Sequence, residues 1–148
     1  TVVGAGGAAK AVSVGLVDSG AQTRICARRQ EQAEEAAKVS GAMVGIFPVE
    51  PGTWDLLVNA TPVGTAPRTN ESILPASSLD GRLVYDLVYN PSCTRLLKAA
   101  SLSGCRTLGG LEMPIAQAKR QFEWWTRVHA PESVFENAAE RDLASTAE

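Results

Sequence analysis

The residues best suited to chemistry lie at the start of the chain, where a short apolar run leads directly into a cluster of glycines. Val2 and Val3 are followed by Gly4, Gly6 and Gly7, and a helix of small residues begins at once. The first glycine permits a tight turn out of a strand, and the second lets a phosphate approach a backbone without Cβ. The N–H groups and positive dipole end of the next helix favour an anion there. The pattern predicts a phosphate cradle; the alternative is a glycine turn that binds nothing.

Ala9 stands where a dinucleotide-binding turn has its third small residue, which lets the helix pack closely on the strand. We therefore expect the backbone of the whole turn to contact a pyrophosphate. The candidate contacts are Gly4, Ala5, Gly6, Gly7, Ala8 and Ala9.

Two adjacent arginines indicate which dinucleotide is expected. An NAD-binding domain usually places Asp or Glu at the end of its second strand, about 20 residues after the glycines. Here that place reads Ala27-Arg28-Arg29, and the next carboxylate is Glu31. Guanidinium groups bind phosphate through paired hydrogen bonds, whereas a carboxylate would repel a 2′-phosphate. These residues favour NADP(H), with Ala27, Arg28 and Arg29 as contacts; alternatively, both arginines only solvate a helix start, where positive charge is slightly unfavourable.

Alternating strands and helices must position these residues. Apolar runs predict strands at 1–3, 23–27, 43–47, 55–59, 83–88 and 106–108. Helical spacing predicts helices at 7–18, 30–39, 94–102, from 112 onward and at 131–143. Residues 60–80 form a long loop with one short helical turn, and Pro91 or Ser92 lies near the cap of the 94–102 helix. This alternation predicts an α/β fold with a parallel sheet and right-handed crossovers.

The helix from Glu112 begins there because Pro114 is tolerated only in a first helical turn. Trp124 and Trp125 on the same helix are interpreted as packing residues, since no basic cluster surrounds them. An apolar stripe on this helix is expected to face the sheet and comprises Leu111, Ile115, Ala118, Phe122 and Trp125.

Composition excludes several classes of function. A chain of 148 residues suits one domain, and a net charge of −2 implies no general affinity for nucleic acid or anionic membranes. Three widely spaced cysteines and a single histidine, His129, match no zinc-ligand spacing, so no metal site is expected. Free thiols are typical of a reducing cytosol, which favours a cytoplasmic protein.

Four stretches together resemble the shikimate dehydrogenases, and their order and spacing fit that family's nucleotide-binding domain over essentially the whole chain. They are Gly4-Ala-Gly-Gly-Ala-Ala-Lys10, Asn59-Ala-Thr-Pro-Val-Gly64, Tyr85-Asp-Leu-Val-Tyr-Asn-Pro91 and Gly110-Leu-Glu-Met-Pro-Ile-Ala-Gln117. We predict a Rossmann-like doubly wound parallel sheet of about six strands in the order 3-2-1-4-5-6, followed by C-terminal helices.

The resemblance implies NADPH-dependent reduction of 3-dehydroshikimate to shikimate, a step of chorismate and aromatic amino-acid biosynthesis. It implies that the cofactor cleft is lined by Asn59, Ala60 and Thr61. It places Leu87, Gly110 and Met113 near the nicotinamide, and it implies that the substrate is reached by Tyr89 and Gln117.

The sequence departs from the family pattern at two places. The family often has Asn-Arg-Thr after the second strand and a further basic residue about three positions on, whereas this chain has Ala27-Arg28-Arg29 and Gln32. The last motif commonly reads Gly-Leu-Gly-Met-Leu, and here Glu112 and Pro114 replace a Gly and the Leu. Arg29 is a candidate for the phosphate contact that the first departure leaves open.

The family's catalytic Lys and Asp belong to a substrate domain that precedes the glycine-rich turn. Residues 1–148 are expected to contain only the dinucleotide-binding domain and no catalytic residue. Lys10 belongs to the phosphate turn, and Asp86 is interpreted as a structural or positioning group at a strand end. The parent protein is therefore expected to be an NADP-dependent dehydrogenase, and the isolated chain to bind cofactor without turnover.

Three alternatives remain at this stage. A quinate/shikimate dehydrogenase or related NADP enzyme could share these motifs, and a non-catalytic nucleotide-sensing module could use the same cradle. A methyltransferase-like site is disfavoured by Arg28 and Arg29, which stand where an acid would hold the adenosine ribose. The oligomeric state is open, with a homodimer among the alternatives.

Overall fold

A computed structural model describes residues 1–131 and 133–145. The strands are β1 (Val2–Val3), β2 (Arg24–Cys26), β3 (Met43–Val44), β4 (Leu56–Asn59), β5 (Leu83–Asp86) and β6 (Arg106–Leu108). The helices are α1 (Gly7–Asp18), α2 (Gln30–Ser40), α3 (Arg95–Leu102), α4 (Glu112–Thr126) and α5 (Val134–Ser145), with one 3₁₀ turn, η1 (Ala76–Ser78). None of the helices within these residues is long and apolar enough to cross a bilayer.

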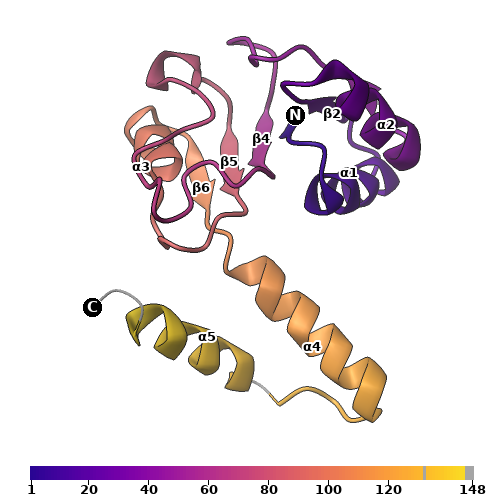
Figure 1. The fold of residues 1–148 in the computed structure, drawn as a ribbon, viewed down its shortest axis with the longest axis vertical. Coiled ribbons are helices and arrows are strands. Elements are labelled where there is room, and N and C mark those ends of the chain that lie inside the picture. The colour runs from indigo at the N-terminus through magenta and orange to yellow at the C-terminus, as the bar shows by residue number, and fades with distance from the viewer. Residues whose placement is uncertain (132, 146–148) are drawn as a thin grey trace.

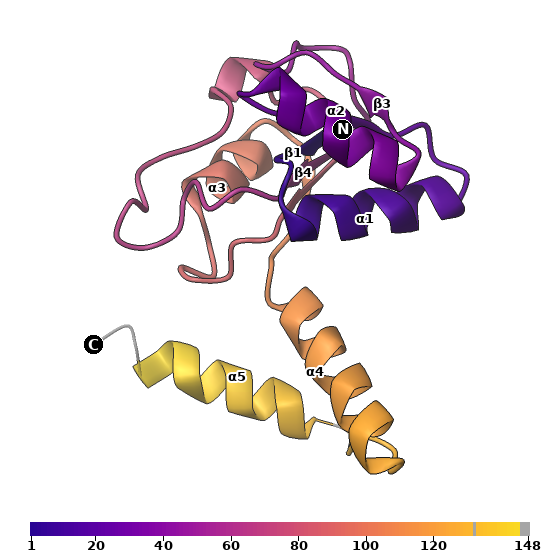
Figure 2. The same ribbon diagram turned by 45° about the vertical axis from the view of Figure 1, so that its right-hand side comes forward.

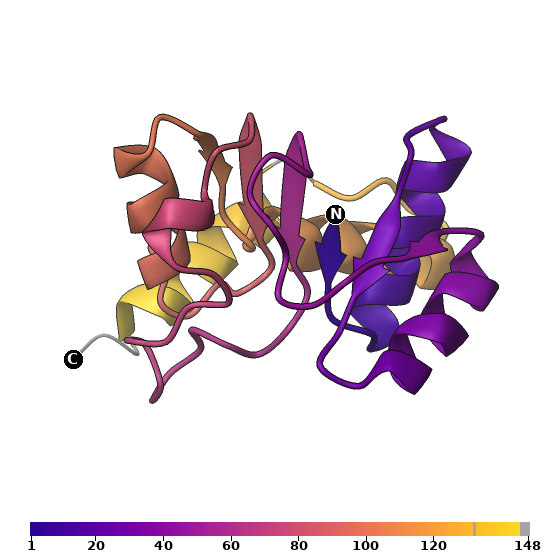
Figure 3. The same cartoon turned by 90° about the horizontal axis from the view of Figure 1, so that it is seen from above.

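The six strands form one parallel sheet in the order β3-β2-β1-β4-β5-β6, which confirms the predicted fold class and strand order. Helices α1 and α2 lie together on one side and α3 on the other, as Figure 3 shows from above. The chain adds β2 and β3 on one side of β1 and then adds β4, β5 and β6 on the other side, so the strand order reverses between β1 and β4. In open α/β sheets, ligands bind beyond the carboxyl ends of the strands at such a switch point.

Two apolar clusters cover the two faces of the sheet, because alternate residues of a strand point in opposite directions. Val2 packs with α1 and α2, whereas its neighbour Val3 belongs to the cluster that includes α3. Leu57 and Val58 divide in the same way. Both faces are thus buried, as a parallel sheet requires, and the ends of the strands carry the polar groups.

The predicted elements are all present, but several details differ. Helix α5 begins at Val134 and ends at Ser145, whereas the prediction was 131–143. Helix α3 is capped by Thr94, whose hydroxyl accepts from the Leu97 N–H, and not by Pro91 or Ser92. Strands β1 to β5 are also shorter than predicted, whereas β6 has the predicted bounds. Strand β5 ends at Asp86 because the Asp86 carboxylate accepts the Val88 N–H and turns the chain.

Helix α4 does not lie against the sheet, so the predicted role of its apolar stripe is wrong. It projects away from the strands and pairs with α5 (Figures 1 and 2). The rings of Phe122 and Phe135 meet edge to face with centroids 5.8 Å apart, and Lys119 pairs with Glu136. The stripe therefore faces α5 in part, while Trp124 and Trp125 are 68% and 72% exposed rather than packed.

Candidate functional site

A cleft of about 860 Å³ opens beyond the carboxyl ends of β1, β2 and β4. Most of its lining comes from the glycine turn after β1, the residues that follow β2 and the long loop that follows β4, with Gln32 of α2 and Phe47 after β3 added to them. The structure brings eight of the predicted site residues onto this cleft, namely Gly4, Ala5, Gly6, Ala27, Arg28, Arg29, Ala60 and Thr61. Its volume lies within the range of small-molecule and cofactor sites.

The glycine turn has the geometry of a phosphate cradle. Gly4 has φ +122°, and a Cβ there would lie 2.7 Å from the Ala60 carbonyl oxygen, so glycine is required. A Cβ on Gly6 or Gly7 would point into open space, which leaves room for a ligand against the backbone. Ala9 is fully buried where α1 packs on the sheet.

The start of α1 is free to bind an anion. Its N-cap is Gly6, and within the described residues no side chain caps this end and no acidic residue occupies its first turn. A helix start without such partners presents N–H groups and partial positive charge to the cleft.

Two guanidinium groups stand on the wall that follows β2. Arg28 and Arg29 are both exposed and line the cleft beside Ala27. The Arg29 Nε donates to the Gln32 Oε1 at 3.1 Å, so Gln32 orients a cation instead of supplying one. This wall is suited to a phosphate group that lies next to the glycine turn.

Asn59 lies beneath the cleft and is completely buried. Its Oδ1 accepts from both the backbone N–H and the hydroxyl of Thr61, at 3.0 and 2.7 Å. Its Nδ2 donates to the Val63 carbonyl at 3.1 Å and to the Asp86 Oδ1 at 2.8 Å. Asn59 therefore shapes the loop whose other residues, including Ala60 and Thr61, reach the cleft.

Asp86 completes this buried network at the end of β5. Its Oδ2 accepts from the Thr94 hydroxyl at 2.6 Å, and its Oδ1 accepts from Asn59 and from the Val88 N–H. Burial raises the pKa of Asp86, and the hydrogen bonds from Thr94, Val88 and Asn59 oppose that rise. A fully buried carboxylate with these partners has the structural role that its place at a strand end suggested.

Replacing Thr94 with valine is expected to lower the free energy of unfolding by about 2 kcal/mol, because α3 loses its cap and buried Asp86 loses a donor. Thr94→Ser keeps the hydroxyl and should lower it by less than about 1 kcal/mol, the value of one lost methyl group. Urea unfolding of both variants measures the difference. Equal losses in both would show that the hydroxyl is not what stabilises this junction.

Leu87 and Gly110 meet just beyond the carboxyl end of β5, the strand that lies next to β4. A Cβ on Gly110 would overlap the Leu87 carbonyl oxygen, so the chain entering α4 passes directly over the end of β5. Met113 follows in the first turn of α4 and is half-buried. The structure thus brings Leu87 and Gly110 together, and Met113 lies three residues further along the chain.

The two predicted substrate residues line separate hollows. Tyr89, 49% exposed, borders an apolar pocket of about 190 Å³ between α4 and α5. Gln117 borders a hollow on α4 together with Arg120 and Trp124. Within the described residues these two side chains do not converge on a common site.

Sequence reasoning missed one wall of the cleft. Residues of the loop after β4 and of the stretch after β3 also line it: Phe47, Pro62, Val63, Arg68, Glu71, Ser72 and Ile73. The signal for all of them but Phe47 was that a long loop followed a buried strand, and Phe47 was predicted to lie in the strand 43–47. Among the described residues, no group of three or more His, Cys, Asp or Glu side chains could hold a metal ion.

Comparison with known proteins confirms the resemblance to shikimate dehydrogenases. The NADP(+) shikimate dehydrogenase of Archaeoglobus fulgidus is 38% identical over 151 residues, which covers 96% of this chain and 56% of that protein. A solved shikimate dehydrogenase in complex with NADP+ superimposes with a TM-score of 0.89 at 34% identity, over 96% of this chain and 53% of that one. No protein-family model matches the chain.

A second solved structure carries more ligands. The Thermus thermophilus shikimate 5-dehydrogenase, in complex with NADP(H) and shikimate, gives a TM-score of 0.83 at 36% identity, over 95% of this chain and 53% of that one. The chain spans about half the length of the relatives that it matches.

Proposed function

We propose that this chain is the NADP(H)-binding domain of a shikimate dehydrogenase, which reduces 3-dehydroshikimate to shikimate with NADPH. One observation carries the proposal: a glycine cradle and two arginines share a single cleft at the switch point of a chain similar to these enzymes. The cradle suits a pyrophosphate and the arginines suit a 2′-phosphate.

Each part of the cleft has a distinct task in this proposal. The backbone from Gly4 to Ala9 receives the pyrophosphate, and Arg28 with Arg29 receives the 2′-phosphate. Leu87, Gly110 and Met113 position the nicotinamide, while the network through Asn59 and Asp86 holds the loop with Ala60 and Thr61 in place. NADPH, when bound, supplies the hydride, and the protein contributes orientation and electrostatics.

The substrate and the proton-transfer groups belong, in our proposal, to a further domain of the parent protein. Lys10 is not among the residues that line the cleft, and Asp86 is buried in its hydrogen-bond network, so neither is placed for proton transfer at the cleft. We assign no catalytic residue to this chain. Tyr89 and Gln117 would contact the substrate from this side, and the exposed Trp124 and Trp125 would lie against the further domain.

We place the protein in the cytoplasm, in accord with free thiols at Cys26, Cys93 and Cys105.

Two alternatives to the main proposal have distinct consequences. A quinate/shikimate dehydrogenase would differ in the substrate that the further domain accepts, and a nucleotide-sensing module would bind cofactor without any reaction. The number of copies in the assembly, one or a homodimer, does not enter the proposed chemistry.

The test is turnover by the protein encoded by the full-length gene. We expect it to oxidise NADPH with 3-dehydroshikimate and to reduce NADP+ with shikimate more efficiently than with quinate, as followed by absorbance of the reduced nicotinamide. The 148-residue chain is expected to bind NADPH by calorimetric titration without turnover. NADPH binding by the full-length protein without any dehydrogenase activity would support the sensing module instead.

A further inference from the structure

Arg68 is a third cation on the cleft, and it approaches from the opposite side to Arg28 and Arg29. The strand order places β2 and β4 on either side of β1. The loops that follow β2 and β4 therefore flank the glycine turn, and the cleft between them is lined by Arg28 and Arg29 on one side and by Arg68 on the other.

The backbone on both sides of Arg68 is anchored to the rest of the domain. The Ala66 N–H donates to the Asn90 carbonyl at 3.1 Å, and the Arg95 Nη1 donates to the Asn70 carbonyl at 2.6 Å. A short turn connects these anchors, because the Arg68 N–H donates to the Thr65 carbonyl at 2.9 Å. The loop thus holds Arg68 at the cleft.

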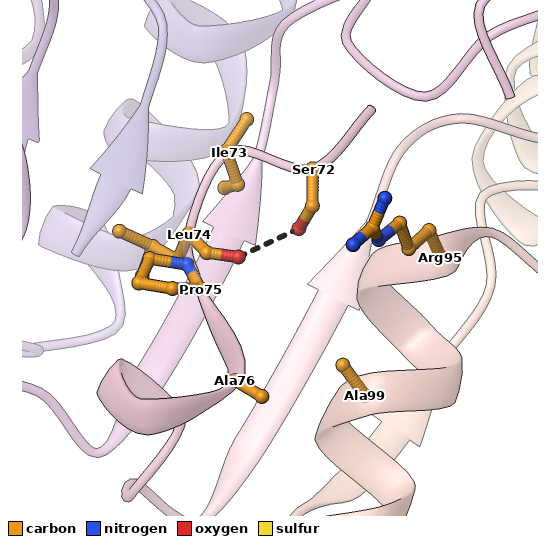
Figure 4. Close-up of a pocket in the computed structure, with 7 residues that line it drawn as sticks. All are labelled: Ser72, Ile73, Leu74, Pro75, Ala76, Arg95 and Ala99. Carbon is orange, nitrogen blue, oxygen red and sulfur yellow. Dashed lines mark hydrogen bonds between the residues drawn. The ribbon is translucent and has the colours of Figure 1, made fainter. Parts of the chain in front are cut away.

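Arg95 itself is committed to holding this loop. Figure 4 shows it beside Ser72 at a separate pocket of about 420 Å³, where the Ser72 hydroxyl donates to the Leu74 carbonyl. Ser72 and Ile73 line both this pocket and the cleft, so their segment forms the wall between the two. Of Arg68 and Arg95, only Arg68 lines the cleft.

The side chain of Arg68 has a weak partner. Its Nη1 lies 3.6 Å from the Glu71 Oε2, and the two side chains are 60% and 46% exposed. Exposed pairs of this kind contribute only about 0–1 kcal/mol. A phosphate dianion would therefore compete effectively with Glu71 for the guanidinium.

The charge of the cleft lining also favours a phosphate ligand. Its charged lining residues are Arg28, Arg29, Arg68 and Glu71, so the lining carries a net positive charge. Gln32, which lines the cleft beside Arg29 and is hydrogen-bonded to it, is uncharged and leaves this balance unchanged.

We propose that Arg68 is a specificity-determining residue that exchanges Glu71 for the 2′-phosphate of NADP(H), with Glu71 as the internal competitor for its guanidinium. The inference rests on the proposed function, because it requires NADP(H) in this cleft. It adds a residue and a competing ion pair that select the phosphorylated cofactor.

The experiment measures the Kd of NADPH and of NADH on the full-length protein and its variants. Arg68→Ala is expected to raise the Kd of NADPH about tenfold, the value of one charge-assisted hydrogen bond, and to change that of NADH less than twofold. Glu71→Gln is expected to lower the Kd of NADPH two- to threefold, or about 0.4–0.7 kcal/mol. Arg106→Ala removes an exposed arginine on β6, off the cleft, and is expected to change neither Kd.

Three results would overturn the inference: an equal effect of Arg68→Ala on both cofactors, no effect on either, or weaker NADPH binding by Glu71→Gln. The Arg28→Ala/Arg29→Ala variant separates this failure from a failure of the proposed function. If that variant loses NADPH affinity while Arg68→Ala does not, the inference alone is wrong. If that variant keeps full NADPH affinity, the NADP(H) site itself is wrong, and the inference falls with it.

Discussion

Replacing both Arg28 and Arg29 with alanine is expected to raise the Kd of NADPH by about 100-fold or more, while the Kd of NADH changes by less than about threefold. Both side chains are exposed on the cleft wall, beside the glycine turn that would hold the pyrophosphate. A hydrogen bond to a charged group contributes about 1.5–3 kcal/mol, and each 1.4 kcal/mol is a factor of ten in affinity. NADH lacks the 2′-phosphate and therefore loses none of these contacts.

Calorimetric titration of both cofactors at fixed ionic strength measures this difference. The double lysine variant, Arg28→Lys/Arg29→Lys, is the matched control, because it keeps the charge but loses the paired geometry of the guanidinium. It should bind NADPH with intermediate affinity. If the alanine variant weakened both cofactors equally, the arginines would act on the pyrophosphate or on the general field of the cleft, and not on the 2′-phosphate.

Replacing Gly4 with alanine is expected to lower the free energy of unfolding by more than about 3 kcal/mol, a large part of the stability of a domain of this size. Gly4 has φ +122°, a conformation that residues with a Cβ rarely adopt. The new Cβ would lie 2.7 Å from the Ala60 carbonyl oxygen and 3.3 Å from the Thr61 Cγ2. Relief of this contact would separate the turn after β1 from the loop after β4, and NADPH binding should be lost with it.

Gly15→Ala is the matched control for this prediction. Gly15 lies within α1, and a Cβ there would meet no atom within 4 Å. Alanine at this position should raise the free energy of unfolding by about 0.5–1 kcal/mol, since glycine is the poorer helix former. Urea denaturation and NADPH titration of both variants give the comparison. Similar stability of the two variants would contradict the close approach of Gly4 to Ala60.

The strand order and the cleft centre could be predicted because their signals are local. Strands and helices alternate along the chain, and right-handed crossovers then leave few arrangements of a parallel sheet. Gly4, Gly6 and Arg28 lie within or beside single turns that follow strands. Their positions at one sheet edge therefore follow from the fold class alone.

Tertiary packing decided what local signals could not. The stripe on α4 was expected to cover the sheet, but periodicity shows only that a helix has an apolar side and not which surface covers it. In the structure Phe122 meets Phe135 of α5, and Trp125 stays exposed. The cap of α3 was misplaced for a related reason: the sequence predicted Pro91 or Ser92 near the cap, and the cap that forms is Thr94, whose hydroxyl also donates to buried Asp86.

The sequence by itself determined the class of fold, because strands and helices alternate along it, and it predicted a phosphate cradle and a preference for a 2′-phosphate, because each of these depends on residue types within one turn. Only the tertiary structure decided that Asn59 lies beneath the cleft and that Arg68 lies on it. Both depend on how the loop after β4 folds back over the sheet edge. That path is set by hydrogen bonds from Ala66 to Asn90 and from Arg95 to Asn70, partners separated by more than 20 residues. No spacing rule within one segment encodes such contacts.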